Sequence, residues 1–205
     1  MHSDTYEITN TKQTLETYEW DRLWIDHPYD TDARRVLYIG DSISYATRSV
    51  LAKQAIDLHW DGFATSKAVD NPFFPDTLRL LHAQAPAPDV LLFNNGLHGW
   101  HLEDETEYAE AYESILCFLL EEWKGAQIVP VLTTCLANEE RNARVQKRNE
   151  AVRAMAERHS LPVLDLYSVS LVNRDKISAD GVHFTEQGYE RLSDTILGFL
   201  KKQSS

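Results

Sequence analysis

The chain alternates short apolar runs with longer amphipathic segments from residue 34 onward. Runs rich in Val, Ile, Leu and Phe, bounded by glycine or polar residues, predict buried strands. They cover residues 34–40, 56–60, 89–96, 126–134 and 161–167. Between and after them, apolar residues recur three and four positions apart, which predicts helices. These helices cover residues 44–55, 73–85, 104–123, 138–159 and 185–202.

This alternation of strands and helices indicates βαβ units, which form a parallel sheet covered by helices on both faces. The expected fold is therefore α/β, a three-layer α/β/α flavodoxin-like sandwich with a five-stranded parallel sheet in the order 2-1-3-4-5. In such sheets the ligand binds beyond the carboxyl ends of the strands. The residues that directly follow each strand are therefore the candidates for chemistry.

The first 30 residues precede this pattern, and we expect them to form an N-terminal extension with one helix at residues 11–25. Residues 31–205 are expected to form a single domain. Two roles for the helix stay open at this point. It could cover an edge of the sheet, or it could provide the contact of a homodimer.

The formal net charge of −12 and the lack of a basic run disfavour a nucleic-acid partner. No apolar stretch is long enough to cross a bilayer, so we expect no membrane partner. The N-terminus lacks the apolar region of a signal peptide, and we expect a cytoplasmic protein. Cys117 and Cys135 have neither a metal-binding nor a redox spacing and are expected to be buried.

Two short blocks at strand ends carry candidate chemistry. Gly40-Asp41-Ser42 follows the first strand, and Asp180 and His183 stand three positions apart after the last one. A carboxylate so close to an imidazole can accept from its Nδ1–H and leave Nε2 available as a base. Ser42 alone could be only a helix N-cap. With a base and its orienting acid at the same sheet edge, it is better interpreted as a nucleophile.

These blocks, in this order and at strand ends, resemble the SGNH/GDSL hydrolase superfamily of serine esterases and acylhydrolases. The final block continues with Phe184-Thr185 and Gly188-Tyr189, as in that family. The resemblance implies a carboxylic ester hydrolase that needs no metal or organic cofactor. Ser42, His183 and Asp180 would be nucleophile, base and orienting acid. We expect a small-molecule ester with an acetyl or other short acyl group as substrate, with an acetylated carbohydrate as the leading candidate.

The oxyanion hole is where the chain departs from the family. The usual Gly-x-Asn-Asp block is replaced by Gly-Leu-His-Gly at residues 96–99, so His98 stands where the family has its amide donor. A neutral imidazole can donate one N–H and could replace the amide. Asn94 and Asn95 are alternative amide donors. Ser66, after the second strand, could supply the backbone N–H that the family takes from a glycine.

The substituted block also supports a second hypothesis. The chain could be a catalytically silent α/β module that binds a carbohydrate or another small ligand in the same cleft. Labelling of Ser42 by a serine-directed probe distinguishes the two hypotheses.

Overall fold

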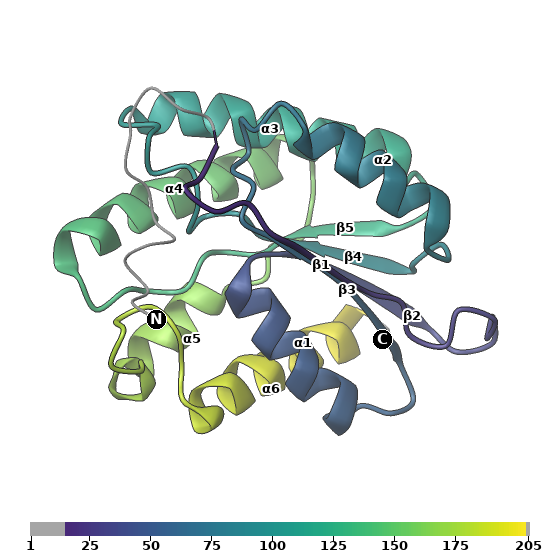
Figure 1. Cartoon of the computed structure of the whole chain (residues 1–205). Helices are drawn as coiled ribbons and strands as arrows, with labels where there is room; N and C mark the ends of the chain where they lie inside the picture. The colour runs from purple at the N-terminus through teal and green to yellow at the C-terminus, as the bar shows by residue number, and fades with distance from the viewer. Residues whose placement is uncertain (1–14, 204–205) are drawn as a thin grey trace.

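The computed structural model describes residues 15–203, which form a central sheet with helices on both sides (Figure 1). The sheet has the strand order β1-β3-β2-β4-β5. Four strands are parallel, and β1 runs antiparallel to β3 at one edge. The strands are β1 (Asp21–Trp24), β2 (Arg35–Gly40), β3 (His59–Thr65), β4 (Val90–Phe93) and β5 (Gln127–Pro130).

The helices divide between the two faces of the sheet, as Figure 1 shows. On one face lie α2 (Phe74–Gln84), α3 (Glu105–Glu122) and α4 (Glu139–Arg158). On the other lie α1 (Ser42–Gln54), α5 (Leu166–Val172) and α6 (Glu186–Gln203), with a 3₁₀ turn at Arg174–Lys176 after α5. The predicted three-layer α/β/α class is confirmed. Within residues 15–203, no helix combines the length and the apolar character needed to cross a membrane.

Alternate residues of the central strands supply two separate cores. All six residues of β2 are buried. Val36 and Tyr38 pack toward the core that includes α1 and α6, whereas Leu37 and Ile39 pack toward the core that includes α2 and α3. A parallel strand buried on both faces has no polar side to show, which is why the sequence reads as one apolar run.

The prediction of a helix at residues 11–25 is wrong over its described part, because residues 21–24 form strand β1. Trp24 pairs with Gly62 of β3, and its ring packs against Tyr45 of α1, with centroids 4.7 Å apart. The Arg48 guanidinium lies over the same ring at 5.8 Å. These partners, distant in the sequence, stabilise a strand despite the helical spacing of the segment. Residues 11–14 lie outside the described residues.

The fifth predicted strand is also absent as a strand. Residues 161–167 make one isolated parallel bridge, Val131 to Leu164, and the chain then enters α5. The order 2-1-3-4 is therefore present as β3-β2-β4-β5, and the fifth strand is β1 on the opposite edge. Cys135 is buried as expected, but Cys117 is exposed on α3.

Candidate active site

Ser42 is placed by the sharp transition from β2 to α1. It is the first residue of α1, and Asp41 is the N-cap, whose Oδ1 accepts from the Ile43 N–H at 2.9 Å. Asp41 therefore takes the capping role, and the half-buried Ser42 side chain remains accessible. Burial raises the pKa of Asp41, against the lowering effect of the His98 and His183 charges.

Asp180 is held by the short loop between Ile177 and Phe184. Its Oδ1 accepts from the backbone N–H groups of Val182 and His183 and from the Ser178 hydroxyl, each at 2.9 Å. Gly181 within this loop has φ +78°, a conformation that L side chains rarely adopt. Burial alone would raise the pKa of Asp180. These hydrogen bonds, with the one from His183, instead hold it well below its usual range, so the group is a carboxylate.

A continuous chain of hydrogen bonds links Asp180, His183 and Ser42. Asp180 Oδ2 lies 2.8 Å from His183 Nδ1, and His183 Nε2 lies 2.8 Å from Ser42 Oγ. A carboxylate can only accept, so the proton on Nδ1 belongs to His183. Nε2 is then the acceptor for the Ser42 hydroxyl. The structure thus brings together the three residues that the sequence singled out as a nucleophile, a base and an orienting acid.

Several of the residues proposed for the oxyanion hole are hydrogen-bonded to other parts of the protein. The Ser66 N–H donates to the Trp20 carbonyl at 3.1 Å, so it is not available as an oxyanion donor. Asn95 is 0% exposed, and its Nδ2 donates to the Lys67 carbonyl at 2.8 Å. Asn94 Nδ2 similarly bonds Val131 O and Thr133 Oγ1. These hydrogen bonds join Ser66 and Asn95 to the backbone around them and do not favour either residue as an oxyanion donor.

His98 is the remaining side-chain candidate of that group. It is 7% exposed, and it lies close enough to Asp41 to lower the pKa of that carboxyl. Its Nδ1 is 3.4 Å from Glu16 Oε1. His98 thus stands near the turn that carries Ser42, and the oxyanion role stays a prediction for it.

Comparison with known proteins now identifies the family. The model of the GDSL-like Lipase/Acylhydrolase family matches residues 38–191. The chain belongs to this family. As a GDSL-like hydrolase, it is a carboxylic ester hydrolase. A search of the curated proteins finds no match.

Solved structures share the fold of this GDSL-like hydrolase at low sequence identity. A member of the lipolytic protein G-D-S-L family from Veillonella parvula is 17% identical, with a TM-score of 0.65 over 81% of this chain and 97% of its own. The acetyl xylan esterase AlAXEase is 15% identical, with a TM-score of 0.62 over 80% and 98%. A variant of an acetyl-xylooligosaccharide esterase from Geobacillus is 18% identical, with a TM-score of 0.59 over 80% and 93%.

Sequence reasoning missed the contribution of residues 15–20 to the site of this GDSL-like hydrolase. Glu16 is 9% exposed, and its Oε1 accepts from the Gly99 N–H at 3.3 Å, beside His98. The Glu19 carboxylate accepts from the Asn71 amide and the Ser66 hydroxyl. Nothing in the local sequence marks these two acids, because these partners lie 47 or more positions further along the chain.

Arg148 of α4 is a second residue that the sequence did not reveal. Its buried guanidinium donates to the carbonyls of Gly96, His98 and Gly99 at 3.1, 2.7 and 2.8 Å. Its Nε pairs with Glu105 at 2.7 Å. The loop that carries His98 is thus held by an arginine from the helix that the sequence predicted at residues 138–159.

A cavity of about 330 Å³ opens beside the triad. It is lined by Leu136, Asn138, Arg141, Asp180, Gly181 and Val182. Asp180 is the residue of the triad that forms part of its wall, and neither Ser42 nor His183 lines it.

Proposed function

We propose that this GDSL-like hydrolase cleaves a small acyl ester through an acyl-enzyme on Ser42. The observation that carries the proposal is the hydrogen-bond chain from Asp180 through His183 to Ser42, with both distances at 2.8 Å. A nucleophile, a base and a group that orients the base are the parts that covalent acyl transfer requires. This geometry favours catalysis over the alternative of a silent binding module.

In the first half-reaction, Ser42 Oγ bonds to the carbonyl carbon of the ester while its proton passes to His183 Nε2. The tetrahedral intermediate then breaks its bond to the alcohol oxygen, which takes the proton from His183. Water repeats the sequence on the acyl-enzyme and releases the carboxylic acid. Asp180 stabilises the imidazolium in both halves without becoming protonated.

The oxyanion of each tetrahedral intermediate needs donors in place before it forms. We assign this role to the backbone N–H of Ser42 at the start of α1 and to the His98 ring. The helix N-terminus favours negative charge at this position. The Glu16 carboxylate beside His98 Nδ1 would hold the imidazole in one orientation.

For the substrate, we propose an acetyl or other short-chain ester, with an acetylated carbohydrate as the leading candidate. The support is the likeness in fold to esterases whose names specify acetyl xylan and acetyl-xylooligosaccharide. Hydrolysis rates for nitrophenyl acetate, butyrate and octanoate, and for acetylated xylooligosaccharides, test this. A preference for octanoate would overturn the short-chain proposal and leave the mechanism intact.

The mechanism is tested on Ser42 itself. Ser42→Ala is expected to lower nitrophenyl acetate turnover by about a thousandfold or more. Labelling by a fluorophosphonate, detected at Ser42 by mass spectrometry, is expected in the native chain and not in Ser42→Ala. Ser49→Ala, whose hydroxyl donates to the Tyr45 carbonyl within the same helix, is the matched control and is expected to be labelled and active like the native chain. If the native chain is as inert as Ser42→Ala and takes up no label, the silent-module hypothesis replaces the proposal.

His98→Ala is expected to lower the rate of acyl transfer by about a hundredfold, as for other single oxyanion donors. The measurement is kcat/KM for nitrophenyl acetate, with the melting temperature measured in parallel. A change in melting temperature without a change in rate would show that His98 only supports the loop.

A further inference from the structure

A second group of chemically active side chains lies at the end of the sheet opposite the triad. Asp26 follows β1, which runs antiparallel to β3, and so it comes beside the first residues of β3. His59 is the first residue of β3 and pairs with Arg35 at the start of β2, whereas Ser42 follows the carboxyl end of β2. Six strand residues separate the two sites by roughly 20 Å.

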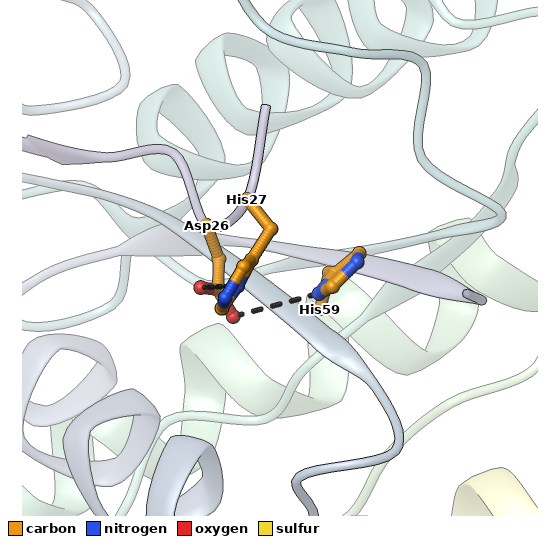
Figure 2. Close-up of side chains that lie close together, drawn as sticks. All are labelled: Asp26, His27 and His59. Atoms are coloured by element: carbon orange, nitrogen blue, oxygen red, sulfur yellow. Dashed lines mark hydrogen bonds and ion pairs between the residues drawn. The ribbon is translucent and has the colours of Figure 1, made fainter. Parts of the chain in front are cut away.

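Three potential ligands of two types lie together there, as Figure 2 shows. The carboxylate of Asp26 lies beside both imidazoles, and the His27 and His59 rings stack with their centroids 5.0 Å apart and an interplanar angle of 20°. His27 Nδ1 lies 2.7 Å from Asp26 Oδ1, and His59 Nδ1 lies 3.8 Å from Asp26 Oδ2. One ligand atom from each residue lies within 4.8 Å of the other two. Tetrahedral zinc spaces its ligands roughly 3.3 Å apart, so zinc binding would require the exposed His27 ring to rotate out of its stack on His59.

The surrounding groups resemble the outer shell of a metal site. His59 Nε2 lies 3.0 Å from Asp30 Oδ2 without an aligned hydrogen bond, and this nearby carboxylate would favour the proton on Nε2 and leave the lone pair on Nδ1. The Trp60 N–H donates to Asp26 Oδ2 at 3.2 Å. Metal-binding histidines usually donate their other N–H to a carboxylate or carbonyl, and ligating carboxylates are themselves hydrogen-bonded.

The backbone that carries these ligands is held in place by one buried arginine. Arg35 is 3% exposed, and its guanidinium donates to the carbonyls of Asp26, His27 and Asp30 at 2.7, 3.0 and 3.2 Å. His27 adopts φ +39°, a conformation uncommon for residues other than glycine. The loop is thus fixed in a conformation that points the His27 ring toward Asp26 and His59.

We propose that Asp26, His27 and His59 bind one divalent transition-metal ion, with Asp30 as the carboxylate that orients His59. Two imidazoles and one carboxylate suit zinc, with water in the fourth position. The ion would link the loop after β1 to the start of β3 and stabilise the edge of the sheet, away from the ester chemistry. This site is independent of the proposed acyl transfer.

The test measures zinc binding to the full chain, without a histidine tag, after dialysis against a chelator. Titration against a zinc-binding dye is expected to give one site per chain, and zinc is expected to raise the melting temperature. His27→Ala removes a ligand whose side chain is 72% exposed, so the variant is expected to fold. Asp30→Asn is expected to weaken zinc affinity by about 10- to 100-fold, and His27→Ala by more.

Two control variants locate the ion. His82 lies 3.8 Å from Glu122, an imidazole and acid pair without a second histidine, and His82→Ala is expected to bind zinc like the native chain. His183→Ala is expected to do the same. Full zinc affinity in His27→Ala, loss of the site in His183→Ala, or no stoichiometric binding to the native chain would each overturn the proposal. The ligand-field absorption of bound Co²⁺, lost in His27→Ala, would support it independently.

Discussion

At the scale of single residues, the pair that we propose as base and orienting acid is fixed by a few adjacent positions. Asp180 and His183 lie on one loop, and the carboxylate bonds both the ring and the backbone N–H of His183. This local geometry is why a three-residue spacing was enough to predict the pair. Ser42, by contrast, joins them only through the fold, from 141 positions away.

The lowered pKa of Asp180 predicts how stability depends on pH. A carboxyl group whose pKa is lower in the folded state stabilises the protein above its unfolded pKa, about 3.9, and loses this effect as pH falls toward the folded value. Asp180→Asn should therefore lower the free energy of unfolding at pH 7, and this deficit should shrink progressively below about pH 4. Urea denaturation of both proteins, from about pH 2 to about pH 7, measures this difference in the free energy of unfolding. A deficit independent of pH would contradict the ionised carboxylate.

Glu16 is predicted to act on catalysis through His98. Glu16→Gln removes the charge beside His98 Nδ1 while keeping an acceptor for the Gly99 N–H. We expect kcat to fall about tenfold with little change in KM, because the effect is on the transition state. In a double-mutant cycle, Glu16→Gln should lower kcat little further when His98→Ala is already present. Glu103→Gln, at an exposed position, is the control. If the effects of the two substitutions on kcat were fully additive, Glu16 would act independently of His98.

At the scale of elements, the loop at residues 96–100 depends on α4 and α3. Arg148 binds three carbonyls of the loop, and Glu105 at the start of α3 binds Arg148. Gly96 allows the close approach of this loop to Thr133, since a Cβ there would lie 1.7 Å from Thr133 Oγ1. The position of His98 is therefore decided by packing between helices and strand ends, which no local pattern encodes.

Arg148→Ala is expected to destabilise the protein by about 3 to 5 kcal/mol, because it leaves buried carbonyls and part of a buried carboxylate without their donor. Chemical denaturation measures this change. Arg191, whose exposed guanidinium lies 4.0 Å from Asp194 on α6, provides the control. Arg191→Ala should change the free energy of unfolding by about 0.5 kcal/mol or less. Equal changes in the free energy of unfolding for the two variants would contradict the stabilising role of Arg148.

At the scale of the whole molecule, residues 15–30 contribute to the sheet and to the candidate site. Strand β1 covers the edge of β3, and Glu16 and Glu19 bond residues after β3 and β4. Arg35 relies on carbonyls of the 26–30 loop for most of its partners. The expected boundary between residues 30 and 31 thus separates groups that are packed together.

Deletion of residues 1–30 is accordingly expected to produce an insoluble or strongly destabilised chain. It exposes an edge strand and leaves the Arg35 guanidinium buried without its carbonyl acceptors. Solubility on expression and the melting temperature of any soluble fraction measure the effect. A soluble deletion variant with the native melting temperature would instead support residues 31–205 as a self-sufficient domain.

The sequence by itself determined the α/β class, the position of the nucleophile turn and the Asp180–His183 pair. Each depends on local physics: apolar runs make buried strands, amphipathic spacing makes helices, and short turns bring neighbouring residues together. Tertiary structure decided that residues 21–24 are a strand, that Ser66 and Asn95 bond the scaffold, and that Glu16 and Arg148 hold His98. Those outcomes depend on partners dozens of positions away, whose approach only the folded chain specifies.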